Sequence, residues 1–195
     1  MDQTIAYYNK NAQDFCENTK DADMGFCRDK FLQYLTKGSC ILDAGCGSGR
    51  DTKEFIAAGY DVVAMDASAK ICEEASKYIG QPVLNLTFHE IDFVNEFDGI
   101  WACASLLHVS REEMGEALNC LRTALKEDGV LYASFKYGDD EEVINGRFFN
   151  YYNETSAADL FKTGSFDVLE IFITQDVREG RKSEQWVNIL ARKRN

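Results

Sequence analysis

Three alternating glycines follow a short apolar run early in the chain. The run Cys40–Ala44 leads into the segment DAGCGSGRD, which spans residues 43–51. Glycines at this spacing let a backbone turn tightly and approach a ligand without interference from side chains. A short apolar run that stops at glycines is typical of a buried parallel strand, and ligands of open α/β sheets lie beyond the carboxyl ends of such strands. We therefore expect a ligand-binding turn here.

Two carboxylates flank this turn and narrow the choice of ligand. Asp66 ends the next apolar run, DVVAMD, where a carboxylate can accept hydrogen bonds from both hydroxyls of a ribose. Asp43 precedes the turn, and its charge would repel a pyrophosphate but suits the ammonium group of a methionine-derived ligand. Arg50 also replaces the third glycine of the dinucleotide pattern GxGxxG. These residues favour S-adenosylmethionine over NAD.

The elements that must position these groups alternate along the chain. Helices are expected over residues 50–58, from a Ser68 cap to 79, after a Ser110–Glu113 capping box, and from a Thr155 cap to 161. Strands are expected over residues 40–44, 61–65, 83–89, 99–104 and 130–135, followed by a hairpin of residues 168–173 and 186–191. The pattern predicts a mostly parallel α/β sheet with helices on both faces and one antiparallel strand inserted late. We expect a single domain over residues 1–195, with two leading helices in 1–37 and the sheet core in 38–195.

The motifs together resemble those of class I S-adenosylmethionine-dependent methyltransferases. ILDAGCGSGRD is similar to the first motif of that superfamily, VVAMDAS to the second, and HEIDF and FDGIWACASLLHVS to the third and fourth. The resemblance covers residues 35–192 approximately, and SLLHV and SFKYG are closest to bacterial tellurite-resistance-like small-molecule methyltransferases. It implies a Rossmann-like, seven-stranded, mostly parallel sheet with an antiparallel C-terminal hairpin strand and an N-terminal helical lid.

The resemblance also implies a set of cofactor contacts. The glycine turn would surround the methionine part of the cofactor, Asp66 would hold the ribose, and the adenine amino group would donate to Asp92. Phe93 or Ile91 would pack against the adenine ring, although Phe93 is equally compatible with a core position. A tyrosine of the leading helix, Tyr8 or Tyr7, would reach over the cofactor. The implied cofactor-binding residues are Tyr8, Asp43, Gly45, Cys46, Gly47, Gly49, Asp66, Ala67, Asp92, Phe93 and Ala104.

Three further residues are candidates for the acceptor side. His108 follows the fourth strand, where the methyl group should lie, and is either a general base or a substrate contact. Lys136 and Arg147 follow the fifth strand and are basic groups in an acidic protein, so they suggest an anionic acceptor. Ion pairs with the acidic residues 139–142 are the alternative interpretation.

Composition excludes several other classes of protein. The 195 residues include 21 Lys and Arg against 33 Asp and Glu, a net charge of −12, which disfavours nucleic acid as substrate. The seven cysteines form no CxxC pair, and the acids are not grouped at ligand spacing, so we expect reduced thiols and no metal. No stretch of about eighteen apolar residues occurs and the first residues are neither basic nor apolar, so we expect a cytoplasmic protein without membrane contact. The oligomeric state is left open.

The sequence therefore predicts an enzyme that transfers a methyl group from S-adenosylmethionine to a small molecule and releases S-adenosylhomocysteine. The acceptor atom can be oxygen, nitrogen, sulfur or a metalloid. Two alternatives remain, an NAD(P)-dependent oxidoreductase and a non-catalytic S-adenosylmethionine-binding protein.

Overall fold

A seven-stranded sheet forms the centre of the computed structural model, which describes residues 2–178 and 180–194. Its strand order is β3-β2-β1-β4-β5-β9-β8. Each neighbouring pair is parallel except for β9, which runs antiparallel between β5 and β8. The strands are β1 (Cys40–Ala44), β2 (Asp61–Asp66), β3 (Leu84–Asn85), β4 (Phe97–Ala102), β5 (Leu125–Lys136), β8 (Phe166–Gln175) and β9 (Gln185–Lys193). The predicted α/β architecture with its late antiparallel strand is confirmed.

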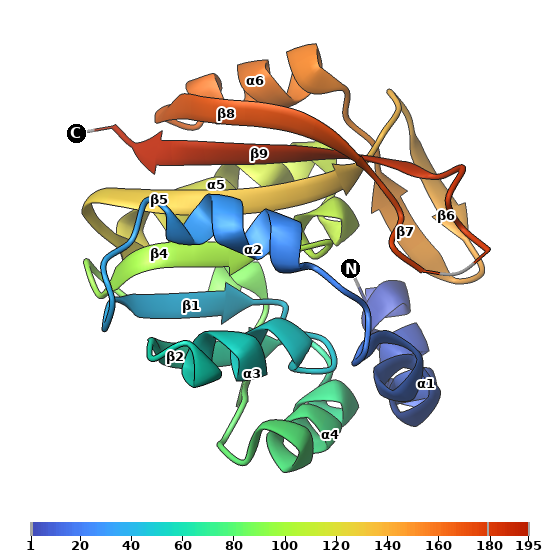
Figure 1. Cartoon of the computed structure of the whole chain (residues 1–195). Helices are drawn as coiled ribbons and strands as arrows, with labels where there is room; N and C mark the ends of the chain where they lie inside the picture. Colours follow the sequence, from blue (N-terminus) through green and yellow to red (C-terminus); the bar gives the residue numbers. More distant parts are fainter. Residues whose placement is uncertain (1, 179, 195) are drawn as a thin grey trace.

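Helices cover both faces of the sheet (Figure 1). In that view α2 and α3 lie in front of the strands and α5 lies behind them, whereas α1 and the small hairpin β6–β7 stand beyond the carboxyl ends of β1, β4 and β5. The helices are α1 (Asp2–Thr19), α2 (Gly25–Leu32), α3 (Arg50–Ala57), α4 (Ala69–Ile79), α5 (Arg111–Ala124) and α6 (Glu154–Thr163). None of those in the described part of the chain is long and apolar enough to cross a bilayer.

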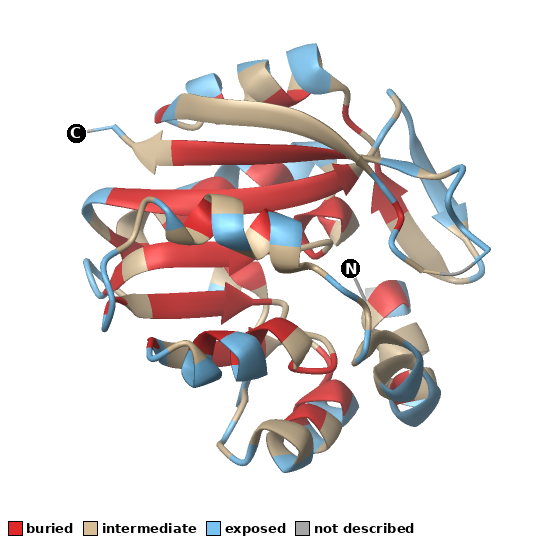
Figure 2. Cartoon of the chain, in the orientation of Figure 1, coloured by how far each residue is buried: buried red, intermediate tan, exposed pale blue. Residues whose placement is uncertain are grey.

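The core lies on the two faces of the central strands. β1, β4, β5 and β9 are buried along most of their length (Figure 2). On one face, Phe31 of α2 and Phe55 of α3 pack against Trp101, which stacks on Tyr132 with ring centroids 3.9 Å apart. On the other face the apolar stripe of α5 packs against the same strands. Because both faces of these strands are covered, their carboxyl ends are held in fixed positions.

The structure differs from the sequence-based expectation in three local features. The third strand is only two residues long, because a capping box between Thr87 and Glu90 turns the chain into a 3₁₀ helix (Phe88–Glu90). Asn153, not Thr155, caps α6, and its side chain accepts a hydrogen bond from the Ser156 amide. The sequence interpretation also missed the hairpin of β6 (Glu141–Ile144) and β7 (Arg147–Asn150), which projects past the sheet edge.

Candidate functional site

A cavity of about 280 Å³ opens at the carboxyl edge of the sheet. It extends from the glycine turn after β1 and the end of β2, past the end of β4, to α1 and the β6–β7 hairpin. The structure brings most of the predicted site residues to this one cavity. Those that line it are Tyr8, Asp43, Gly45, Cys46, Gly47, Asp66, Ala67, Ala104, His108, Lys136 and Arg147.

The glycine turn adopts the left-handed backbone that its sequence predicts. The φ angles of Gly45, Gly47 and Gly49 are 84°, 55° and 78°. A Cβ atom at Gly45 would lie 2.4 Å from the Cβ of Ser105, so the turn can pass the end of β4 only because no side chain is present. Gly49 does not line the cavity, because it abuts Ile79 of α4 and caps α3. Its contact with the cofactor stays a prediction, and in the structure it packs against α4.

Asp43 is a buried carboxylate at the edge of the cavity. It is 2% exposed and accepts a hydrogen bond of 2.5 Å from the Thr52 hydroxyl. Burial, together with the negative charge of Asp51, raises the pKa of Asp43 to about 7. No Lys, Arg or His of the described residues lies within ion-pair distance of it. A buried acid without a cation is a site where a ligand ammonium fits, because that charge would stabilise the ionised form.

Asp66 lies on the opposite side of the same turn. Its two carboxylate oxygens accept hydrogen bonds from the Gly47 amide (3.1 Å) and the Ser68 amide (2.9 Å). Burial raises its pKa to about 6, so it is ionised at neutral pH. Each oxygen has further lone pairs for a pair of ligand hydroxyls. Asp43 and Asp66 thus flank the turn as acceptors for a cation and for hydroxyls.

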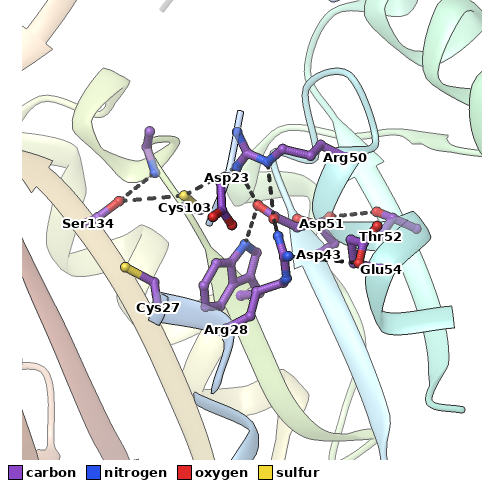
Figure 3. Close-up of polar contacts among 12 residues, drawn as sticks. Asp23, Cys27, Arg28, Asp43, Arg50, Asp51, Thr52, Glu54, Cys103 and Ser134 are labelled. Carbon is purple, nitrogen blue, oxygen red and sulfur yellow. Dashed lines mark hydrogen bonds and ion pairs between the residues drawn. The ribbon is translucent and has the colours of Figure 1, made fainter. Parts of the chain in front are cut away.

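A second polar cluster lines the cavity near the start of α3, where the sequence predicted the start of a helix at Arg50 and left open whether Arg28 is a surface residue or binds the carboxylate of the cofactor. Asp51 lies between Arg28 and Arg50, at 2.8 Å and 2.5 Å (Figure 3). Although burial raises the pKa of Asp51, the two arginines lower it below its ordinary value. The Trp101 indole donates to the same carboxylate at 3.0 Å. Arg50 is the residue of the sequence that could have indicated this cluster, because it stands where a dinucleotide-binding turn has glycine.

His108 and Tyr8 form a hydrogen-bonded pair at the cavity. The Tyr8 hydroxyl lies 2.9 Å from His108 Nε2, and Nδ1 lies 2.6 Å from the Phe148 carbonyl oxygen. Because a carbonyl only accepts, Nδ1 carries the proton and Nε2 accepts from Tyr8. Burial, and then the positive charges of Arg147 and Lys136, lower the pKa of His108 to about 4 despite the Phe148 carbonyl. His108 is therefore neutral at physiological pH.

The two predicted basic residues differ in their surroundings. Lys136 forms an ion pair of 2.8 Å with Glu184 of the C-terminal hairpin. Arg147, the first residue of β7, forms no ion pair with any described residue. Neither side chain pairs with the acidic residues 139–142, the alternative partners that the sequence suggested. Lys136 is already neutralised by the chain, and Arg147 is not.

Asp92 and Phe93 are not among the residues that line the cavity, and their contact with adenine stays a prediction. Asp92 is exposed, and Phe93 packs edge-on against Phe97 with ring centroids 5.2 Å apart. The 3₁₀ helix lies between the short β3 and these two residues. Leu86, Thr87 and Phe88 line the cavity at this point instead, because they directly follow the short β3.

Comparison with known proteins finds a family model that matches part of the chain. Residues 41–129 match the methyltransferase domain family. A putative methyltransferase of Encephalitozoon cuniculi is 30% identical over 127 residues, which cover 64% of this chain and 58% of that protein. The chain spans 38–58% of the lengths of the curated relatives it matches.

Solved structures show the same fold over almost the whole chain. The 1,6-didemethyltoxoflavin-N1-methyltransferase of Burkholderia thailandensis, solved with 1,6-didemethyltoxoflavin and S-adenosylhomocysteine, has a TM-score of 0.84 at 21% identity. The match covers 100% of this chain and 88% of that one. A TehB-like S-adenosylmethionine-dependent methyltransferase of Corynebacterium glutamicum has a TM-score of 0.72 at 18% identity, over 97% and 99% of the two chains. Residues 41–129 thus match a methyltransferase domain, and the whole chain shares the fold of these solved methyltransferases.

Proposed function

We propose that this protein transfers a methyl group from S-adenosylmethionine to a small-molecule acceptor. One observation carries the proposal: Asp43 and Asp66 flank the glycine turn at a cavity that continues past Ala104 to Tyr8 and His108. S-adenosylmethionine supplies a methyl group that its sulfonium has already activated, so the protein's main tasks are to bind, align and exclude water.

The chain offers partners for the ammonium and the ribose hydroxyls of the cofactor. Asp43 would accept from the ammonium and Asp66 from the ribose hydroxyls, while Gly45, Cys46 and Gly47 would lie along the methionine. Ala67, with Leu86 and Phe88 on the other wall, would contact the adenine. In this arrangement Ala104 would lie near the transferred methyl group, and the Tyr8 ring would cover it.

The size of the cavity and the net charge of the chain support a small acceptor. A volume of about 280 Å³ suits small molecules, and the net charge of −12 opposes binding to nucleic acid. The structure of 1,6-didemethyltoxoflavin-N1-methyltransferase, whose fold this chain shares, contains a small-molecule ligand of that kind. A pyrophosphate cofactor would meet the carboxylate of Asp43, which disfavours the oxidoreductase alternative.

Titration calorimetry with S-adenosylhomocysteine and, separately, with NADH tests the cofactor. We expect heat with the first and none with the second. Transfer of radiolabelled methyl from S-adenosylmethionine to a panel of small metabolites then tests catalysis. Binding without methylation of any acceptor would favour the non-catalytic alternative.

A further inference from the structure

Arg147 stands at the cavity with its charge unneutralised by the described residues. Its guanidinium lies over the rings of Tyr7 and Phe149, 4.7 Å and 5.1 Å from their centroids. Its Nε atom is buried and has no hydrogen-bond partner among the described residues. Arg147 as a whole is half-buried, but burial of its unpaired Nε donor costs free energy, so this residue is arranged for a partner that the described residues do not provide.

The other cations that line the cavity are each paired with an acid. The pairs are Arg50 with Asp51, Arg178 with Asp176, Arg181 with Glu184, and Lys136 also with Glu184. Each of these cations therefore has an acid within ion-pair distance, although Lys136 and Arg181 share Glu184 and Arg50 shares Asp51 with Arg28. The charge of Arg147 is the one at this cavity for which the described residues provide no counter-ion, and an incoming anion would supply it.

The groups beside Arg147 are poorly suited to remove a proton from an acceptor. The lone pair of His108 Nε2 is occupied by the Tyr8 hydroxyl, and Nδ1 already carries a proton that it donates to the Phe148 carbonyl. Of the carboxylates that line the cavity, Asp51 and Asp176 form ion pairs with arginines, and Asp43 and Asp66 lie at the glycine turn, where we assign them to the cofactor. Neither nitrogen of His108 is therefore free to take a proton from an acceptor that binds beside Arg147.

We propose that the methyl acceptor is an anion at neutral pH, a small molecule with an ionised hydroxyl or ring N–H group, and that Arg147 is its counter-ion. This inference rests on the proposed methyltransferase function. The lone pair of the acceptor anion forms the new bond to the methyl carbon as the carbon–sulfur bond breaks, and the electrons of that bond remain on sulfur. Anion and sulfonium give two products that are neutral at the reacting atoms, so no proton has to leave.

The apolar lining of the cavity supports this choice of substrate. Opposite charges combine in the transition state, so a water-poor site favours the step relative to bulk water. The same site would exclude an anion unless a fixed cation offset the loss of hydration, and Arg147 is placed to do so. Phe149, Phe88 and Leu107 line the cavity with aromatic and aliphatic surface.

The test compares anions with neutral analogues of the same shape. Protein saturated with S-adenosylhomocysteine is titrated with 4-nitrophenolate against 4-nitroanisole, and with benzoate against benzamide. We expect each anion to bind about tenfold or more tightly than its neutral analogue, the usual effect of one charge-assisted hydrogen bond. Arg147→Gln should remove that preference, Arg147→Lys should keep part of it, and Arg122→Gln on the outer face of α5 should leave it unchanged.

The outcomes separate this inference from the function on which it rests. Failure of S-adenosylhomocysteine to bind would overturn both. If S-adenosylhomocysteine binds, any of three results would overturn the anionic acceptor alone. These are equal affinity for the anion and its neutral analogue, no binding of either anion, and a preference for the anion that persists in Arg147→Gln. An unchanged affinity for S-adenosylhomocysteine in Arg147→Gln shows that the variant is folded. If Arg147→Gln is not folded, Arg147→Lys is titrated in its place.

Discussion

The buried carboxylate of Asp43 makes a quantitative prediction about cofactor binding. Its pKa of about 7 means that about half of the unliganded protein carries a proton there at pH 7. A ligand ammonium beside it would return that pKa toward its ordinary range, because opposite charges favour the ionised form. Binding of S-adenosylhomocysteine should therefore release about half a proton at pH 7.

The same linkage sets the pH dependence of affinity. Below pH 7 a growing fraction of Asp43 must lose its proton before the ligand binds, so the dissociation constant should rise about tenfold from pH 8 to pH 6. Asp66, with a pKa of about 6, adds about a factor of two at the acid end. In Asp43→Asn the dissociation constant should rise only by the factor of about two that Asp66 contributes. Asp167 is an exposed acid paired with Arg194, so Asp167→Asn should behave as the wild type.

Calorimetry in buffers of different ionisation enthalpy measures the released proton directly, and titrations at pH 6, 7 and 8 give the affinities. The reasoning is refuted if the binding heat is independent of buffer and the dissociation constant is flat across this range. That result would mean that the ligand ammonium does not face Asp43.

Further predictions concern stability and the Tyr8–His108 pair. Because the raised pKa of Asp43 disfavours the ionised form, that residue destabilises the unliganded protein above pH 7 and ceases to do so as pH falls toward 4. Asp43→Asn should raise the free energy of unfolding at pH 8 by about 1–4 kcal/mol in urea denaturation. Gly45→Ala should cost about 1–3 kcal/mol more than Gly59→Ala by the same assay, since both have positive φ but only Gly45 meets Ser105. An equal loss of unfolding free energy in the two variants would mean that the turn at Gly45 shifts to accommodate the alanine side chain. Imidazole NMR should show His108 neutral down to about pH 5, and Arg147→Gln should raise its pKa because a neighbouring positive charge is removed. A wild-type midpoint near 6.5 would contradict the burial of His108 and the effect of the neighbouring positive charges.

The sheet and the cofactor half of the site were predictable because local signals agreed with the fold. The apolar runs of β1 and β2 end at Asp43 and Asp66, and a parallel sheet brings the ends of neighbouring strands together. Ser68 and Gly80 mark the two ends of α4 as predicted, the first through its hydroxyl and the second through its left-handed backbone.

The acceptor half was harder because its geometry depends on contacts distant in sequence. Tyr8 and His108 are 100 residues apart in the sequence, and no local pattern predicts their hydrogen bond. The β6–β7 hairpin that places Arg147 did have a signal, Asn145-Gly146, which is typical of a tight hairpin turn and has positive φ at both residues. The position of Asp92 outside the cavity lining was not predictable, because it follows a 3₁₀ helix that no sequence pattern had suggested.

The binding of S-adenosylhomocysteine to the full chain tests the central claim most directly. Calorimetry at pH 8 should show one site per chain, with affinity lost in a variant that carries both Asp43→Asn and Asp66→Asn and retained in Asp167→Asn. A folded wild-type protein that gives no binding heat at several temperatures, or a double variant that binds as the wild type does, would contradict the assignment of this cavity to the cofactor.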